Sequence, residues 1–338
     1  MKVIKFFAIT AMAAAMITSC SNEDELSQSN YPSDNIIRVT AGVNNAKTRA
    51  EGAGTEMKND FSLTIVNKNA PKYTYTDKVF SKSSGDWACS ETLLWQKSDA
   101  LVDIVAFAPA QTGKFNGVYA NGSIQPIAYS VASDQSTASD KNDLLYYYAK
   151  DFNPGTSLVN KKLSIQFNHA FCMIDIVVTL GTEFNKPKVL DDSPIVKVTL
   201  DGTKIAANVD VKNAATGSTT TTAASVVTAN EEATPTTITT TKGTFTKAAN
   251  AEANAKSCFS CIAIPQTVAA NTFKVSLMTA GKRYEWTSDK EITLQSGYRY
   301  TLELSMGNDV VLLKGGSDNG GITATPWGNG TGGSLETD

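Results

Sequence analysis

The chain has 338 residues and a net charge of −3 at pH 7, with 30 basic and 33 acidic side chains. The charges are mixed along the sequence without a lysine- or arginine-rich block, so a nucleic-acid partner is not expected. The length allows two domains of ordinary size. One histidine and five cysteines leave little room for a catalytic triad or a zinc site, and we expect no catalytic residue, no metal and no cofactor.

The first residues have the pattern of an exported lipoprotein. Residues 1–19 contain two lysines and then a short run of small apolar residues, and a strongly polar stretch follows. Because the apolar run is too short to cross a bilayer, it indicates a cleaved signal peptide. The signal leads into ITSC, residues 17–20, which matches a bacterial lipobox and predicts lipid attachment at Cys20. An ordinary signal followed by a chance cysteine is the alternative.

Residues 20–49 are expected to form a tether and a short strand. The acidic stretch SNEDEL after Cys20 resembles the surface-export signal of Bacteroidetes lipoproteins, with a solvated tether as the alternative. Further on, IIRVTAGV predicts a strand whose apolar face is formed by Ile37, Val39, Ala41 and Val43. A loop of small polar residues, NNAKTRAEGAG, follows and contains Arg49, and such loops are preferred sites of proteolysis. Arg38 is a competing cleavage site that the strand would protect.

The remaining chain has the pattern of β structure. LVDIVAFAP predicts a central strand, since it is apolar on both faces except at Asp103. KKLSIQFNHAFCMIDIVVTL predicts two strands that meet at His169 and Ala170, where the apolar alternation changes register. FKVSLMTAGKRYEW predicts a hairpin, and EITLQSGYRYTLEL predicts two strands joined at residues 296–297. Many short strands separated by turn residues are typical of β-sandwiches.

Less regular stretches divide the chain. The loop DFNPGTSLVN indicates a domain boundary, with an N-terminal β-sandwich at 50–155 and a C-terminal one at 156–338. A threonine- and alanine-rich insertion at about 212–256 is expected to mix exposed strands with long loops. The segment SDQSTASDKNDLLYYYAK is the place where one or two helical turns are expected.

The residues with reactive or aromatic side chains have structural explanations. His169 lies between apolar strands and is expected to support the fold, and the scattered carboxylates do not indicate a glycosidase pair. Cys258 and Cys261 fall in one strand and would face opposite sides, so free thiols are expected. Tryptophans stack on sugars in some proteins, but they belong to cores more often, and the chain has four: Trp87, Trp95, Trp286 and Trp327.

The order of motifs resembles the fimbrillin family, the type V pilins of Bacteroidales. After the lipobox and the strand that ends near the TRA arginine, TLLWQKSDALVDIVAFAP supplies a tryptophan and an apolar strand ending in proline. A DLLY element at 143–146 and an F-x-H-A element at 167–170 follow. IPQT at 264–267, SGYRYTLEL and a closing stretch at 322–327 complete the series. The resemblance covers nearly the whole chain, and the threonine-rich insertion departs from it.

The resemblance implies two transthyretin-like β-sandwiches and a route of assembly. Such pilins reach the outer membrane as lipoproteins, and a trypsin-like protease then cuts after the loop arginine, here Arg49. The cut removes the N-terminal strand with its lipid anchor and leaves an open sheet edge. A C-terminal strand of the next subunit then fills the opening by strand addition. The implied donor segment contains Val310, Val311, Leu312, Leu313, Ile322 and Trp327.

The function implied by the resemblance is that of a structural subunit of a surface fimbria that supports adhesion. The implied partners are other pilin subunits, the maturation protease and, before cleavage, the outer membrane. Two other classes stay open, namely a tip or anchor subunit and a non-polymerising surface lipoprotein that binds carbohydrate. The N-terminal residue of the mature protein separates them, since Ala50 indicates polymerisation and a blocked Cys20 indicates one of the alternatives.

Overall fold

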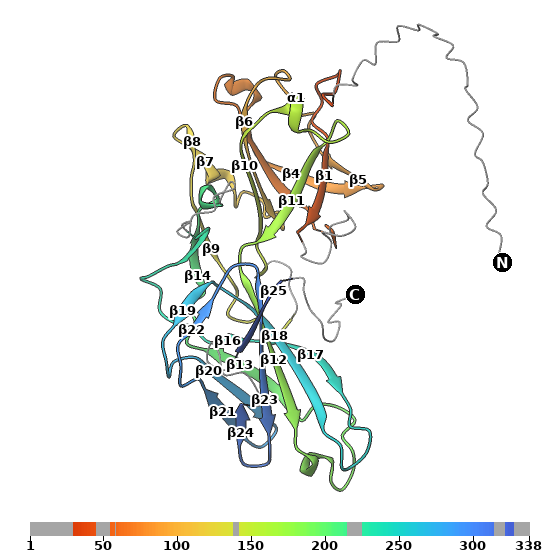
Figure 1. The fold of residues 1–338 in the computed structure, drawn as a ribbon, viewed down its shortest axis with the longest axis vertical. Coiled ribbons are helices and arrows are strands. Elements are labelled where there is room, and N and C mark those ends of the chain that lie inside the picture. The colour runs from red at the N-terminus through yellow and green to blue at the C-terminus, as the bar shows by residue number, and fades with distance from the viewer. Residues whose placement is uncertain are drawn as a thin grey trace, which may run out of the picture.

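The computed structural model describes residues 30–44, 55–57, 59–137, 142–214, 225–313 and 322–327. The fold is all-β, as predicted, and its strands form two lobes along the long axis of the molecule (Figure 1). An eight-stranded sheet builds the first lobe, and a six-stranded and a four-stranded sheet build the second. Within the described ranges, no helix is long and apolar enough to span a membrane.

The sheet of the first lobe closes on itself. Its order is β11 (Leu163–His169), β10 (Leu145–Phe152), β6 (Val102–Ala108), β3 (Phe61–Val66), β4 (Tyr75–Ser83), β5 (Asp86–Cys89), β1 (Val39–Val43) and β2 (Thr55–Glu56). Because β1 also pairs with β11, the order returns to its start. The predicted central strand is β6, which is buried throughout and lies between β10 and β3. Phe61, Trp95 and Phe167 are among the apolar side chains that fill the lobe.

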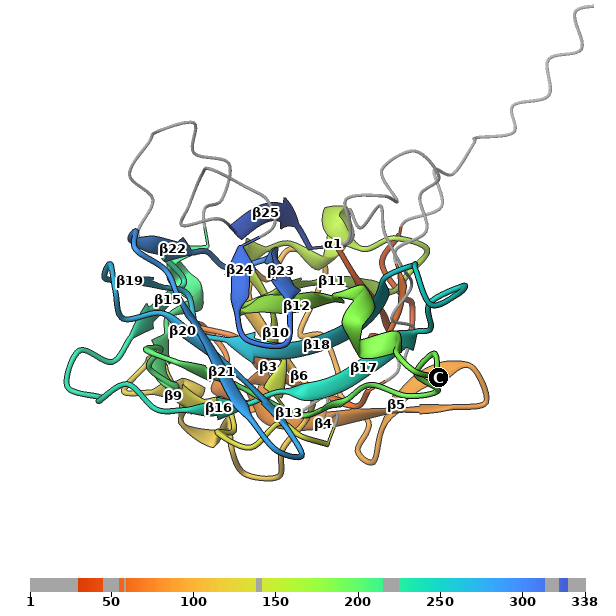
Figure 2. The ribbon, with the colours of Figure 1, turned by 90° about the horizontal axis from the view of Figure 1, so that it is seen from below.

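The second lobe has two sheets that share one core. The larger sheet contains β17 (Thr241–Thr246), β18 (Ala255–Ala263), β12 (Cys172–Leu180), β23 (Tyr298–Met306), β24 (Val311–Leu313) and β25 (Ile322–Pro326). The smaller one contains β16 (Ile238–Thr239), β13 (Ile195–Asp201), β20 (Lys274–Thr279) and β21 (Arg283–Thr287). Alternate residues of β12, such as Ile174 and Ile176, share a core cluster with Leu200 and Leu277 of the smaller sheet. Figure 2 shows β12, β18 and β17 side by side, with β13 and β16 on one side of them.

The two lobes are joined by a third apolar cluster and a small sheet. In that sheet β9 (Ile127–Ser130) pairs with β14 (Ala206–Val209), which pairs with β15 (Val227–Ala229). The cluster combines Phe107 of the first lobe with Phe171 and Ile264. The buried side chain of Gln135 donates to the Ile262 carbonyl at 2.9 Å and accepts from the Ile262 amide at 2.8 Å. These contacts tie segments from the two halves of the chain to one another.

The remaining described elements are short. Two further strand pairs are β19 (Gln266–Val268) with β22 (Ile292–Leu294), and β7 (Tyr119–Ala120) with β8 (Ser123–Ile124). The helical turns are η2 (Pro71–Tyr73), η3 (Asn116–Val118), α1 (Pro154–Ser157), η5 (Thr182–Asn185) and η6 (Val211–Asn213).

Several segments singled out in the sequence can be placed among the strands and their partners. The chain passes from the first lobe to the second between β11 and β12, beyond the loop where the boundary was expected, because β11 still pairs with β1 and β10. The strands β22 and β23 both exist, but they pair with different sheets. Of the stretch where one or two helical turns were expected, residues 138–141 lie outside the described residues, and the part from Leu145 onward belongs to β10. The helix α1 follows β10, because Asn153 accepts from the Gly155 amide and Pro154 stands at the helix start.

Candidate strand-exchange site

The strand expected to be removable, β1, is held mainly by β11. The two strands run parallel, and Val39 to Val43 lie opposite Leu163 to Phe167. The ladder extends at both ends, since the Arg38 carbonyl accepts from the Leu163 amide at 2.8 Å and the Asn44 amide donates to the Phe167 carbonyl at 2.8 Å. The other edge of β1 pairs with β5 at Val39 and with β2 at its last two residues.

The strand β11 depends on this partner. Its antiparallel pairing with β10 joins His169 to Leu145 and Asn168 to Tyr146. Within the described residues, Leu163 to Phe167 therefore have β1 as their ladder partner. We call the position beside β11 that β1 occupies the β1 slot. Emptying it would leave a row of backbone donors and acceptors without partners, and such an edge favours the addition of a new strand.

The apolar face of β1 packs into the first lobe. Ile37 and Val39 are buried in its core cluster, and Ala41 and Val43 are half-buried against the same cluster. Thr40 points outward and is exposed. The Ile37 amide also donates to the Leu93 carbonyl at 2.9 Å, which fixes the segment just before β1. The N-terminal strand therefore fills part of the core of the first lobe.

Arg38, the competing cleavage site, stands directly before β1. Its guanidinium makes two hydrogen bonds to the Asp34 carboxylate, from Nη1 to Oδ1 at 3.0 Å and from Nη2 to Oδ2 at 2.6 Å. This side-chain bonding is the main reason why the pKa of Asp34 falls to about 2. With its backbone in the β11 ladder and its side chain paired, Arg38 is expected to be protected from a protease.

The two modification sites expected from the sequence, Cys20 and Arg49, lie outside the described residues. The structure does place the two ends of the loop that contains Arg49. Val43 of β1 pairs with Thr55 of β2, so the loop connects two antiparallel strands. A cut in this loop would leave β1 attached to the rest of the protein by non-covalent contacts alone.

The expected donor segment lies on its own lobe. β24 and β25 run antiparallel to β23, with Val311 opposite Met306 and Ile322 opposite Leu302. Val311 and Ile322 are buried in the second core. Val310, Leu312 and Leu313 are exposed, and Leu312 is 58% exposed. The end of the chain thus presents large apolar side chains on a strand at the edge of a sheet.

The last described residue, Trp327, connects this segment to the first lobe. Its indole ring stacks on the imidazole of His169, with ring centroids 3.9 Å apart and planes 5° apart. The Nδ1 atom of His169 lies 2.9 Å from Oδ2 of Asp143, and the Trp327 amide donates to the Gly297 carbonyl at 2.7 Å. We call Trp327, His169 and Asp143 the Trp327 stack. It holds the end of β25 at the junction of the lobes (Figure 1).

Sequence reasoning named His169 and Trp327 but missed the contact between them. The DLLY and F-x-H-A motifs contain Asp143 and His169, and these two residues meet because β10 pairs with β11. Linear spacing gives no sign of a ring stack between residues so far apart in the chain. The His169 ring contacts the Trp327 indole through its face and the Asp143 carboxylate through Nδ1, and we expect this contact to support the fold.

Four of the described residues with reactive side chains are cysteines. The cysteines of the described ranges are free; Cys172 and Cys261 are buried, and Cys89 and Cys258 are half-buried. Burial raises the pKa of the Cys261 thiol to about 12, which makes it a poor nucleophile. In the part of the chain that the structure describes, no three His, Cys, Asp or Glu side chains gather as metal ligands would.

Solved structures share this fold, among them three Bacteroides proteins. A candidate cell-adhesion protein of Bacteroides ovatus has a TM-score of 0.58 and 15% identity, over 86% of this chain and 95% of its own. A second from Bacteroides uniformis has a TM-score of 0.53 and 15% identity, over 88% of this chain and 99% of its own. A fimbrial protein of Bacteroides vulgatus has a TM-score of 0.51 and 14% identity, over 86% of this chain and 99% of its own. At these identities the similarity shows a common fold.

A family model gives the assignment. No match was found among the curated proteins. The family model described as fimbrillin-like matches residues 48–327. The match begins directly before Arg49 and ends at Trp327, so it leaves out β1 and includes β24 and β25. Since it covers most of the sequence, the chain belongs to the fimbrillin-like family.

Proposed function

We propose that this chain is a structural subunit of a surface fimbria, made as a lipoprotein and supporting adhesion. Lipid at Cys20 holds the precursor in the outer membrane, a trypsin-like protease cuts after Arg49, and the subunit then joins an extracellular fimbrium by strand exchange. Membership of the fimbrillin-like family supports the fimbrial role and assembly with other pilin subunits. This role requires neither a catalytic residue nor a cofactor in the chain.

The position of β1 is the observation that carries the proposal. It precedes all other described strands, it is the ladder partner of Leu163 to Phe167, and its apolar face fills part of the first core. If this strand leaves, β11, β10, β6, β3, β4 and β5 keep their order, and β2 loses its partner. The departure of β1 would open a slot with both unpaired backbone groups and apolar surface, which is what strand addition requires.

Strand exchange also needs a donor, and the C-terminal segment has suitable features. β24 lies at a sheet edge, and Val310 just before it and Leu312 within it are exposed. Before it can enter another subunit, this segment must leave β23, and its end must leave the Trp327 stack. The uncleaved chain therefore corresponds to a closed precursor in which β1 occupies its slot and the donor lies on its own lobe.

Limited trypsin digestion tests the cleavage step. Trypsin is expected to cut after Arg49 first and to leave a core beginning at Ala50, and the cleaved protein is expected to form ladders that resist sodium dodecyl sulfate. The Arg49→Ala protein should stay monomeric. Ladders from Arg49→Ala, or cleaved protein that stays monomeric at high concentration, would contradict strand exchange at this site.

A substitution at an exposed donor residue tests the second step. Leu312 is 58% exposed in the monomer, so Leu312→Lys should leave monomer stability within about 0.5 kcal/mol. In a polymer the same side chain would be buried, and the lysine should abolish the ladders. Val196→Lys is the matched control, because Val196 is 64% exposed on β13 of the same lobe and outside the donor segment. Equal ladders from both variants would remove β24 from the mechanism.

Two alternative functions predict a different fate for the lipid anchor. A tip or anchor subunit, or a surface lipoprotein that binds carbohydrate without polymerising, would retain its lipid at Cys20. Sequencing the mature protein from the cell surface separates the classes, because a free Ala50 supports the polymerising subunit and a blocked Cys20 supports one of the others. Labelling with a radioactive fatty acid tests the lipid directly, and equal labelling of the parent and Cys20→Ala would reject lipidation there.

A further inference from the structure

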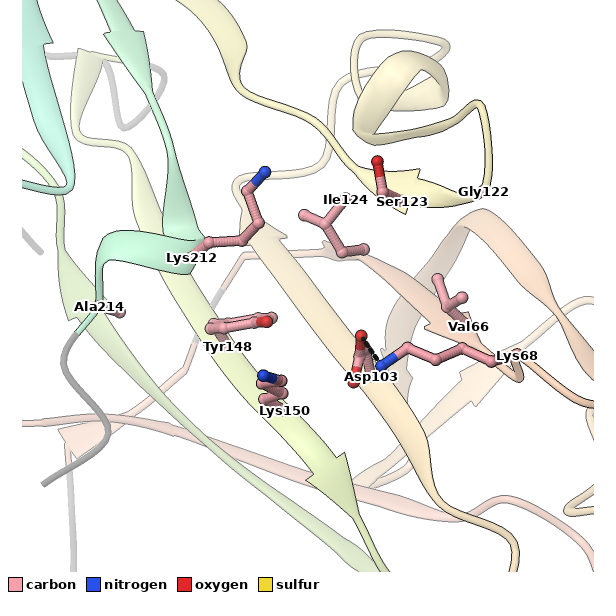
Figure 3. A pocket seen from close by; sticks show the side chains of 10 residues that line it. All are labelled: Val66, Lys68, Asp103, Gly122, Ser123, Ile124, Tyr148, Lys150, Lys212 and Ala214. Carbon is pink, nitrogen blue, oxygen red and sulfur yellow. Dashed lines mark ion pairs between the residues drawn. The ribbon is translucent and has the colours of Figure 1, made fainter.

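A cavity of about 370 Å³ lies at the junction of the lobes, and none of its lining residues belongs to β1, β24 or β25. This volume is at the lower end of the range for ligand pockets, roughly 300–1,000 Å³. Figure 3 shows Tyr148, Lys150 and Lys212 on one side, Lys68 and Asp103 on another, and Ser123 and Ile124 above them. The side chains come from both halves of the sequence.

Asp103 is a charged residue at an unusual place. It interrupts the otherwise apolar β6, and its side chain is only 10% exposed. Each oxygen of its carboxylate has a partner, since Oδ2 lies 2.9 Å from Lys68 Nζ and Oδ1 accepts from the Asp151 amide at 3.0 Å, and each can accept one more hydrogen bond. An ion pair whose lysine is 48% exposed adds little to stability. It does give one wall of the cavity fixed donors and acceptors.

Two other lysines of the cavity are available to a ligand. Lys150 on β10 and Lys212 on η6 are both exposed, and neither ammonium group has an ion-pair or hydrogen-bond partner among the described residues. The nearby Asp210 uses Oδ1 to accept from the backbone amide of Lys212. Asp103 and Asp151 both contact Lys68. The two unpaired cations therefore favour a ligand that carries a negative charge.

The remaining walls suit a ring with hydroxyl groups. Tyr148 projects between the two lysines, and the buried Ile124 supplies apolar surface opposite it (Figure 3). Burial, followed by the charge of Asp103, raises the pKa of the Tyr148 phenol, so its hydroxyl stays protonated and able to donate. Sugars combine an apolar face with hydroxyl groups, and aromatic rings beside polar groups accommodate both.

We propose that this cavity binds an acidic saccharide, with the carboxylate of a uronic or sialic acid between Lys150 and Lys212 and the sugar ring beside Tyr148. The Lys68–Asp103 pair hydrogen-bonds the ring hydroxyls. The site gives the protein a glycan ligand of its own, which goes beyond the assembly role and does not rest on it.

The test uses the uncleaved full chain and measures saturation-transfer NMR with methyl glucuronoside, with methyl glucoside as the neutral match. The glucuronoside should bind. The glucoside should bind at least about tenfold more weakly, because it lacks the charge-assisted hydrogen bonds. Lys150→Gln with Lys212→Gln should lose binding to the same extent, and added salt should weaken it. Lys256→Gln is the matched control, since Lys256 is exposed on β18 outside the cavity, and this variant should bind like the parent.

Several results would overturn the assignment. They are equal binding of the two glycosides, no binding of either, and undiminished binding by the double variant. If Lys256→Gln loses glucuronoside binding to the same extent, the binding depends on general surface charge and not on the cavity. If the cavity binds an acidic peptide and not the glucuronoside, its ligand belongs to another class. Because the monomer is measured before cleavage, a negative result leaves the polymerisation experiments unaffected, and failed polymerisation leaves this result unaffected.

Discussion

Truncating one buried side chain of β1 should weaken both the precursor and the retention of the strand after cleavage. Val39 is 3% exposed in the first core. Val39→Ala removes two methyl groups, each worth about 0.8 kcal/mol of burial, and leaves a small cavity, so the expected loss is about 2 kcal/mol. Thr40→Ala is the matched control, because Thr40 is exposed on the other face of the strand and its truncation should change stability by less than about 0.5 kcal/mol.

The assay has two parts. Urea unfolding of the uncleaved protein gives the stability difference between the two variants. After trypsin cleavage, size-exclusion chromatography follows the release of the N-terminal fragment, and a loss of about 2 kcal/mol corresponds to roughly 30-fold weaker retention for Val39→Ala. If Val39→Ala and Thr40→Ala unfold at the same urea concentration and release the fragment equally, the face of Val39 does not hold the strand, and the reasoning about the β1 slot is wrong.

Three further predictions concern the surroundings of the site. Trp327→Ala removes a stacked ring pair worth about 0.5–1.5 kcal/mol, so amide hydrogen exchange in β25 should speed up by about twofold to tenfold. His169→Ala should have the same effect, and Thr323→Ala should have none, because the Thr323 side chain is exposed. The pKa of Asp34 in the folded protein is about 2, below its unfolded value of about 4, so the pair with Arg38 stabilises above pH 4 and is lost as the pH falls toward 2. Carboxyl NMR should show this midpoint, and Arg38→Ala should raise it toward the unfolded value, short of a full return because the Ile36 amide still donates to Asp34. In the native protein a thiol reagent should modify Cys89 and Cys258 before the buried Cys172 and Cys261, and equal rates would show that the core opens readily.

The sequence predicted the local parts of the fold well. The apolar run around Val105 gave β6, and the alternations in β11 and β12 gave two strands with a break between them. The hairpin of β20 and β21 was also correct, because its two strands are neighbours in sequence and pair with each other. The period of the apolar residues indicates which face of a strand is buried, and this local pattern was enough to predict these segments.

Non-local pairing explains what the sequence did not predict. β22 and β23 are consecutive, yet β22 pairs with β19 and β23 with β12, so strand spacing gave no information on their partners. The helix α1 has its own signal in Asn153 and Pro154, which was overlooked inside a loop of turn residues. The Trp327 stack and the cavity beside Tyr148 each depend on residues that only the folded sheets bring together.

The geometry of the β1 slot also distinguishes between the two C-terminal strands as donors. A replacement that restores the ladder must supply an amide and a carbonyl to β11 along its length and bury every second side chain. β25 ends in Pro326, which has no amide hydrogen to donate, and its middle residues are threonine and alanine. Residues 310–313 read VVLL, and Val310 and Leu312, which are exposed in the monomer, offer two large apolar side chains on one face. We therefore expect β24 to enter the slot of the next subunit. β25 follows β24 in the sequence, so it is expected to detach from β23 when β24 moves.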